Sequence, residues 1–540
     1  MEFYGRQDIL DLLNKRATAL GKGYRQNIAI IGEESIGKTC LIQHWLSNYY
    51  NNYIVPVYLE ADFKTFSEFG RKFTGTLLFS FLKNRQAALN EDLNALIEKS
   101  AAYIPETVKL IKRILSLKNK KSPENFSLLL ELSESFYQET SKRCIIILDE
   151  FHNLENLRIK DMYNLWRKQI CLSKNTMYVL ISSRKYLAHK IFTGDLNLLF
   201  GNFEKIELGA FDNKTAYAIV QEKLKILTAS SQLSDIIINF SFSHPFYLNA
   251  IACAFKDYLH KEAVSKPGIG SLISSLEDMF IDNWGAFSLR FLRLINKINA
   301  EIKDPASIRI LQQMAKGANC LSKISSLSGK SKKETAAILN QLYHYDFISK
   351  NSDIYVLNDK VFGFWLKTIY THKANSFNIS TQSLKEIFRK EIEAHFNLFL
   401  YAQNKAVSER VLELFNQFSN ELVSVHKKRV RLNRFKEVKL INLGGKQMKK
   451  GILARTASSI WITGLKEDKA SEEDIRDFAS LCKKFKHPKS QKRIFIALGD
   501  MEDNANLIAK EEKISAWDAS ALNTLLDIYD KPRITNKSLP

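Results

Sequence analysis

Short apolar runs alternate with longer amphipathic stretches over the first 210 residues of the chain. The pattern predicts a helix at 39–46 and helical structure from 63 to 137, with a polar break at 118–122. The run at 143–148 is almost wholly apolar, which is typical of a strand buried on both faces. Alternating strands and helices predict an α/β fold with a parallel sheet covered on both faces. The predicted strands are 26–31, 54–59, 143–148, 178–181 and 205–208.

The pattern changes after residue 212. Residues 213–300 are helical, and residues 304–370 predict three short helices followed by two short strands around a turn at 351–353. This order is that of a winged helix-turn-helix. Residues 382–425 return to helix, and strands reappear from Arg431 onward, at 438–442, 460–463 and 494–497, with a helix at 471–484 between the last two. The predicted parts are an α/β core at 1–212, a helical lid at 213–300, a winged helix at 301–372, a helical connector at 373–425 and a basic C-terminal α/β domain at 426–540.

Composition restricts the class of protein. The chain has 79 Lys and Arg against 58 Asp and Glu, and the net charge of +21 favours a polyanionic partner. The six cysteines lack metal-ligand or CxxC spacing, so neither a disulfide framework nor a zinc site is expected. The start of the chain lacks the apolar region of a signal peptide, and no run approaches a membrane span. We expect a cytoplasmic protein without a membrane partner.

A glycine-rich segment after the first predicted strand matches the pattern G-x-x-x-x-G-K-[ST]. Its backbone N–H groups would face a phosphate, Lys38 would reach the β- and γ-phosphates, and Thr39 would ligate Mg²⁺. The following helix would add its positive N-terminal end. The segment therefore predicts binding of ATP and Mg²⁺. The expected nucleotide contacts are Gly32, Glu33, Glu34, Ser35, Ile36, Gly37, Lys38, Thr39 and Cys40.

Two acids follow the apolar run at 143–148. Asp149 is expected at the carboxyl end of a strand, where open α/β sheets bind ligands, and it would hold Mg²⁺. Glu150 would orient and deprotonate the attacking water. At the end of the fourth strand, Ser183 and Arg184 are candidate contacts to the γ-phosphate. Two small residues beginning a loop would be an equally good interpretation of that segment.

Two other classes of nucleotide enzyme fit less well. A GTPase is not favoured, because His152 stands three residues after Asp149 where a glycine belongs, and residues 213–216 lack the final aspartate of the guanine motif. A metabolite kinase is not favoured either, since such enzymes rarely need a DNA-reading module.

Together these motifs resemble the archaeal-type ATPase family, which belongs to the AAA+-related and STAND-related P-loop ATPases. The resemblance covers residues 1–370 and includes Phe3-Tyr-Gly-Arg6, Leu148-Asp-Glu-Phe-His-Asn-Leu154 and the segment 243–248. It implies that Tyr4, Gly5 and Arg6 line the adenine side and that Pro245 lies near the nucleotide.

The chain departs from the family pattern at two places. Ser243 and His244 precede Pro245 where the family usually has a glycine, and Asn202 stands where it often has an arginine. Loss of that arginine puts fast hydrolysis in doubt, and Arg184 is the nearest cation that could replace it.

Basic residues gather in two later regions. Phosphate contacts require such clusters, although solvated surface lysines would look the same. The candidate nucleic-acid contacts are Lys323, Lys330, Lys332, Lys333 and Lys350 of the winged helix, and Lys427, Lys428, Arg429, Arg431 and Arg434 beyond it.

The C-terminal region faintly resembles a restriction-endonuclease-like domain. Lys466 matches the lysine of that nuclease motif, but Gly464 stands where its glutamate should be. Glu467 and Asp468 are the only acids expected near enough to replace it, and both are poorly placed. We therefore expect binding without cleavage.

Two functions remain open at this stage. One is an ATP-hydrolysing switch that couples nucleotide state to DNA binding. The other is a signalling or scaffold ATPase with slow turnover that recruits a protein partner or a second copy of itself.

Overall fold

The computed structural model describes residues 3–83, 92–117, 122–196, 203–224, 231–264, 266–376, 378–425, 428–444, 450–485 and 490–534. The chain divides into two compact units. The first comprises Met1–Phe211 with His244–Phe246, and the second comprises Asp212–Ser243 with Tyr247–Pro540. Each unit is described by itself.

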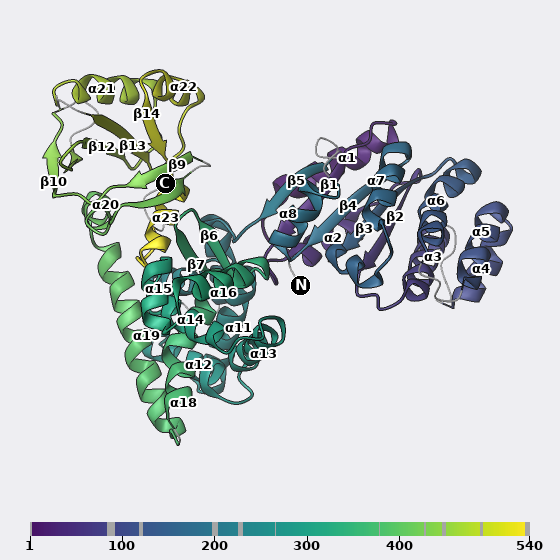
Figure 1. The fold of residues 1–540 in the computed structure, drawn as a ribbon, viewed down its shortest axis with the longest axis horizontal. Helices are drawn as coiled ribbons and strands as arrows, with labels where there is room; N and C mark the ends of the chain where they lie inside the picture. Colours follow the sequence, from purple (N-terminus) through teal and green to yellow (C-terminus); the bar gives the residue numbers. More distant parts are fainter. Residues whose placement is uncertain are drawn as a thin grey trace. The chain divides into compact units, whose positions relative to one another are not determined.

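A five-stranded parallel sheet forms the centre of the first unit (Figure 1). Its strand order is β2-β3-β4-β1-β5, so the strands that precede the phosphate loop and the acid pair are separated by β4 alone. The α/β fold of a P-loop NTPase is therefore confirmed. The strands are β1 (Asn27–Gly32), β2 (Ile54–Glu60), β3 (Arg143–Asp149), β4 (Thr176–Ser182) and β5 (Phe203–Leu208).

Helices cover both faces of this sheet because successive strand residues point to opposite sides. Ile145 and Ile147 of β3 enter one core, with α1 and α2, while Cys144 and Ile146 enter the other, with α3 to α8. The helices are α1 (Gln7–Gly21), α2 (Lys38–Asn48), α3 (Phe66–Lys83), α4 (Leu93–Ala101), α5 (Pro105–Ser116), α6 (Pro123–Thr140), the 3₁₀ helix η1 (Phe151–Leu157), α7 (Met162–Leu172) and α8 (Lys185–Thr193).

The second unit begins with helices, as the pattern predicted. They are α9 (Asn213–Leu224), α10 (Ser231–Phe240), α11 (Pro245–Lys261), α12 (Ile269–Ile281) and α13 (Ala286–Glu301). Aromatic rings fill their core: Phe280 packs against Phe287, Phe291 and Phe364 at centroid distances of 5.0, 6.0 and 6.1 Å.

Three helices and a hairpin follow, in the order that the sequence predicted. They are α14 (Ala306–Ala315), α15 (Leu321–Ser328), α16 (Lys332–His344), β6 (Ile348–Asn351) and β7 (Ile354–Leu357). A capping box fixes the start of α16, because Ser331 Oγ accepts from the Glu334 N–H and Glu334 accepts from the Ser331 N–H. The next helices are α17 (Lys360–Trp365), the π-helix η4 (Leu366–Tyr370) and α18 (Thr371–Asn375).

The prediction of helix through residue 425 was wrong at its end. Helices α19 (Thr381–Gln403) and α20 (Val407–Phe415) are present, but β8 (Glu421–Val425) pairs antiparallel with β9 (Lys428–Leu432). Val423 and Val425 enter a core that also contains C-terminal residues, which explains why this segment is extended. A domain boundary after residue 425 would therefore divide the β8–β9 hairpin.

A mixed sheet of order β10-β11-β12-β13-β14 completes the second unit. Its elements are β10 (Glu437–Asn442), β11 (Lys450–Arg455), β12 (Ile460–Lys466), α21 (Glu472–Cys482), β13 (Gln491–Ala497), α22 (Asp503–Glu511), β14 (Ile514–Trp517) and α23 (Ala519–Ile528). The sequence had predicted β10, β12, α21 and β13.

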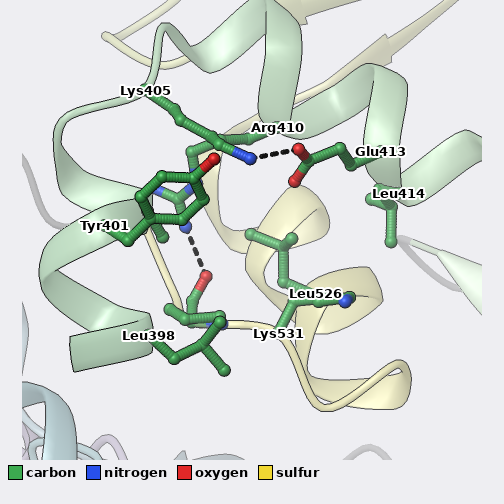
Figure 2. A pocket seen from close by; sticks show the side chains of 10 residues that line it. Leu398, Tyr401, Lys405, Arg410, Glu413, Leu414, Leu526 and Lys531 are labelled. Carbon is green, nitrogen blue, oxygen red and sulfur yellow. Dashed lines mark hydrogen bonds and ion pairs between the residues drawn. The ribbon is translucent and has the colours of Figure 1, made fainter. Parts of the chain in front are cut away.

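The segment after α23 returns to α19 and α20 (Figure 2). Arg410 donates to the Pro532 carbonyl, and Lys405 pairs with Glu413 while its ammonium lies 4.3 Å from the centre of the Tyr401 ring. Burial lowers the pKa of Arg410 to about 10. These contacts surround a cavity of about 60 Å³, so α20 and the chain's last described residues form one packed structure.

Candidate nucleotide site

The candidate site lies where three neighbouring strands end. The phosphate loop follows β1, the acid pair Asp149-Glu150 ends β3, and Ser183 follows β4. Because β3, β4 and β1 are adjacent and parallel, their carboxyl ends meet at one edge of the sheet.

The phosphate loop depends on its glycines. Gly37 has φ +95°, a backbone conformation that L side chains rarely adopt. A Cβ at Gly32 would lie 2.6 Å from the Leu208 carbonyl oxygen, so this glycine allows β5 to approach the loop. Ser35 also has positive φ, at +63°, and α2 begins at Lys38, directly after the loop. The geometry fits the cradle expected for a phosphate group.

Lys38 is almost fully buried beneath this loop. Its ammonium donates to the carbonyl oxygens of Gly32 and Glu33 at 3.1 and 2.7 Å. Burial lowers the pKa of Lys38, while the nearby carboxylates of Glu150 and Asp149 oppose the shift. The Lys38 ammonium is therefore held in place by the backbone of the phosphate loop.

Thr39, in the first turn of α2, contacts Asp149, the last residue of β3. The Thr39 hydroxyl donates to Asp149 Oδ2 at 2.6 Å, and the Tyr58 hydroxyl donates to the same oxygen at 3.0 Å. Hydroxyl and carboxylate oxygens are ligands that Mg²⁺ prefers, and Mg²⁺ keeps several waters besides. The donor set fits a magnesium ion bound together with phosphates.

Glu150 is held in a strained conformation at the same edge. Its φ is +53°, and its Oε2 accepts hydrogen bonds from the Ser183 N–H and the Ser183 hydroxyl, both at 2.8 Å. His152 Nδ1 lies 3.4 Å from that oxygen and 2.9 Å from the Ser182 hydroxyl. Burial raises the pKa of Glu150, although the bonds from Ser183 and the charge of Lys38 oppose the shift.

Three contacts in the site were not predicted from the sequence. Tyr58 reaches Asp149 from β2, His152 contacts Ser182 and Glu150, and Lys185 pairs with Glu33 of the phosphate loop at 2.8 Å. Lys185 thus brings a second cation to the loop beside Lys38. Tyr58 could have been found from its place on a strand next to β3, but only once the strand order was known.

The residues expected around the adenine lie at the start of α1. Gly5 and Arg6 both have positive φ, at +66° and +61°. Arg6 donates to the Gly209 carbonyl, and its guanidinium lies 5.0 Å from the centre of the Phe211 ring. Tyr4, Gly5 and Arg6 are therefore fixed to the segment that follows β5.

The segment before α11 contains one departure from the family pattern. Ser243, in that segment, has φ +54°, in the left-handed region that glycine favours. Pro245 is the first residue of α11. Asn202 lies outside the described residues, as does Lys427.

The candidate nucleic-acid residues differ in how they are held. Lys330 lies 3.8 Å from Asp304 and 3.7 Å from Glu334, Lys323 donates to the Gly317 carbonyl, and Lys350 lies over the Tyr355 ring. Lys323 and Lys350 are exposed. The remaining six are exposed too and make no ion pair within the described residues, although Arg431 donates to the Asn420 carbonyl at 3.4 Å. They are Lys332, Lys333, Lys428, Arg429, Arg431 and Arg434.

The turn between β6 and β7 is joined to β8. Asp353 N–H donates to the Leu422 carbonyl at 3.3 Å, and the Ser424 N–H donates to Asn351 Oδ1 at 2.6 Å. On the hairpin next to this turn, Ser424 pairs with Arg429 and Leu422 pairs with Arg431. The turn between β6 and β7 therefore lies beside the hairpin that carries the exposed arginines of β9.

The prediction about acids near Lys466 was wrong. Lys466 pairs with Asp474 of α21 at 2.5 Å, an acid that the sequence spacing did not suggest. Asp474 Oδ2 also accepts from the N–H and hydroxyl of Ser471, so this carboxylate caps α21. Within the described residues, no group of three or more His, Cys, Asp or Glu side chains could hold a metal ion.

A model of the family "AAA ATPase domain" matches residues 2–165, and no curated protein matches the chain significantly. Three solved structures are similar to the chain: a Walker-type ATPase of Pyrococcus abyssi, the ORC2 protein of Aeropyrum pernix and the RuvB Holliday junction branch migration motor of Thermotoga maritima. Their identities are 15%, 13% and 13%, with TM-scores of 0.45, 0.42 and 0.33. The matches cover 68%, 73% and 70% of this chain and 96%, 96% and 97% of those chains.

In the described residues, no helix is long and apolar enough to cross a membrane. The family match contains the phosphate loop and both acids of β3, and it supports nucleotide binding and ATPase activity in the first unit.

Proposed function

We propose that the protein is an ATP-hydrolysing switch that couples nucleotide state to nucleic-acid binding. The observation that carries the proposal is the meeting of Lys38, the Thr39–Asp149 pair and the Glu150–Ser183 pair at one sheet edge. Each group already has the partner that would hold it during phosphoryl transfer, which depends on positioning and charge stabilisation.

Each residue has a distinct role in this proposal. Lys38 and the loop N–H groups bind the phosphates, and Thr39 and Asp149 hold Mg²⁺, which supplies charge neutralisation when bound. Glu150 orients a water and accepts its proton, while Ser183 fixes the carboxylate by two hydrogen bonds. Tyr4, Gly5, Arg6 and Pro245 border the base, and Arg184 supplies charge toward the γ-phosphate.

The nucleic-acid part of the proposal rests on the exposed cations of the second unit. Lys332 and Lys333 lie at the start of α16, the third helix of the proposed winged helix, which is the helix that reads DNA in such folds. Arg429 and Arg431 project from the same face of the β8–β9 hairpin beside the wing turn. Phosphate contacts from such residues would give strongly salt-dependent binding.

The decisive experiment measures ATP hydrolysis with and without duplex DNA. Under this proposal DNA changes the rate, and Lys332→Ala/Lys333→Ala removes the change while leaving the basal rate intact. A basal rate that DNA does not alter, together with tight retention of ADP, would instead support a slow scaffold ATPase. The hydrogen bonds between the wing turn and β8 favour that second function, because they occupy part of a surface that could contact DNA.

We also propose that the C-terminal domain binds nucleic acid without cutting it. Lys466 is paired with Asp474, which serves as a helix cap, whereas metal-assisted cleavage requires carboxylates that can fix an ion. We expect intact plasmid after incubation with Mg²⁺ or Mn²⁺. Cleavage that disappears in Lys466→Ala would contradict this proposal.

A further inference from the structure

A cluster of exposed aromatic and apolar side chains lies in the first unit, away from the nucleotide site. The five most exposed large apolar side chains in the described residues include Leu172, Tyr24, Tyr50 and Tyr53, at 76, 75, 73 and 70% exposure. Such exposure is unusual for side chains of this size and suggests a binding surface when several of them gather.

The strand topology places all four side chains at the end of the sheet where its parallel strands begin. Tyr24 precedes β1, Tyr50 and Tyr53 precede β2, and Leu172 ends α7 just before β4. These are the amino ends of parallel strands, opposite the edge where Lys38 and Glu150 lie. We name this surface, formed by residues 22–26, 49–53, 141–143 and 171–175, the amino edge.

Hydrogen bonds tie the four segments of the amino edge together. The Arg143 N–H donates to the Tyr53 carbonyl at 2.9 Å, and its guanidinium donates to the Gly21 carbonyl at 3.0 Å. Arg25 donates to the carbonyls of Ile170 and Ser173. The segments therefore form one continuous surface fixed to the sheet.

The loop before β2 holds its side chains by a local turn. The Tyr53 N–H donates to Asn51 Oδ1 at 2.8 Å, and the Tyr50 hydroxyl donates to Asn52 Oδ1 at 3.0 Å. The tyrosine rings therefore face solvent from an ordered loop. Because the loop is already ordered, a ligand that stacks on the rings costs little conformational entropy of the loop.

The positive charge of this surface favours a polyanionic partner. The four segments contain Lys22, Arg25, Lys142, Arg143 and Lys174 but no Asp or Glu. Lys22 and Lys174 are exposed and make no ion pair within the described residues. Aromatic rings interleaved with cations are typical of surfaces that stack the bases and contact the phosphates of single strands. Base pairs in a duplex keep their faces covered, so a duplex would not use the tyrosines.

We propose that the amino edge binds single-stranded nucleic acid, with Tyr24, Tyr50 and Tyr53 stacking on bases and Lys22 and Lys174 contacting phosphates. This site is separate from the basic surface of the second unit and goes beyond the function proposed above.

Fluorescence anisotropy on the full chain tests the proposal, with a labelled oligodeoxythymidine of about 20 nucleotides as probe. Tyr24→Ala/Tyr53→Ala should weaken binding by about tenfold or more, because each stacked base contributes substantially. Tyr24→Phe/Tyr53→Phe should bind like wild type, since the rings remain. Tyr401→Ala, which removes an exposed tyrosine from the second unit, is the matched control and should also bind like wild type.

Crosslinking identifies the surface directly. A strand containing 5-iodouracil should crosslink to Tyr24, Tyr50 or Tyr53 in the full chain, as mapped by mass spectrometry. The same crosslinks should persist in Arg429→Ala/Arg431→Ala, so loss of duplex binding in that variant would test the proposed function alone. The proposal is overturned if the wild-type chain does not bind the oligonucleotide, if the double alanine variant binds as tightly as wild type, or if crosslinks map only to other surfaces.

Discussion

The candidate nucleotide site and the β8–β9 hairpin hold their charged residues in opposite ways. In the first unit, Lys38, Asp149 and Glu150 are withdrawn from solvent, and each is held by hydrogen bonds from a neighbouring strand or loop. In the second unit, Arg429 and Arg431 stand exposed on a hairpin without ion-pair partners in the described residues. The first arrangement suits chemistry at a fixed point, and the second suits contacts along an extended polyanion.

The difference sets how strongly each unit should respond to a single substitution. Removing one held group from the first unit leaves its partners buried and unpaired, so the loss is large and specific. Removing one exposed cation from the second unit costs one phosphate contact, and the loss depends on salt.

The largest effect is expected for Lys38→Ala. The substitution removes the buried cation beneath the phosphate loop, and we expect ATP binding to weaken by more than about a hundredfold in calorimetry. Lys185→Ala is the matched control, because Lys185 is a half-exposed cation paired with Glu33 of the same loop. Unchanged ATP affinity in Lys38→Ala would contradict the nucleotide site.

Glu150→Gln separates binding from turnover. The amide keeps the size of the side chain but cannot accept a proton from water, so we expect ATP affinity within about twofold of wild type and turnover lower by about a hundredfold or more. Single-turnover hydrolysis and nucleotide binding measured on the same preparation give both numbers. Turnover close to wild type would show that another group activates the water.

The pH dependence of turnover examines the environment of Glu150. Burial raises the pKa of this carboxyl, and the base works only when ionised, so turnover should fall as the pH drops through that raised pKa. The hydroxyl bond from Ser183 opposes this rise, and alanine removes it while keeping the backbone N–H bond, so Ser183→Ala should move the acid limb to higher pH. Circular dichroism over the same pH range controls for unfolding. If the acid limb of the turnover profile does not move in Ser183→Ala, that limb belongs to a group other than Glu150.

Sequence reasoning succeeded where a residue's environment depends on its near neighbours. β1, β3 and β4 are short, mainly apolar runs, since they are buried on both faces, and the phosphate loop is contiguous. The hairpin β8–β9 was missed because its apolar side chains pack into a core that lies partly in the C-terminal segment, a contact that the local sequence does not show. β14 was missed because, unlike β6 and β7 of the same length, it does not stand beside a short turn that joins it to a neighbouring strand.

The missed contacts of the site depend on pairings between distant segments. Tyr58 reaches Asp149 because β2 lies next to β3, where Glu60 is registered with Asp149. Asp474 reaches Lys466 because the cap of α21 turns back onto the end of β12. Neither pair can be recognised from its spacing in the sequence. Strand order brings Tyr58 to Asp149, and the packing of α21 onto its sheet brings Asp474 to Lys466.

The smallest effects are expected among the cations of the second unit, and they should follow how each cation is held. Arg429→Ala/Arg431→Ala removes two exposed cations that make no ion pair in the described residues, so the slope of log affinity for duplex DNA against log salt should become shallower by about two. Lys330→Ala should change that slope little, because Lys330 lies near both Asp304 and Glu334 and is already partly neutralised.

Filter binding at several salt concentrations measures both slopes, and thermal unfolding checks that each variant is folded. Equal slopes for the two variants would mean that exposure and pairing do not decide which cations contact phosphate. The contrast between the two units would then be confined to the nucleotide site, where burial and hydrogen bonds fix each group before ligand arrives.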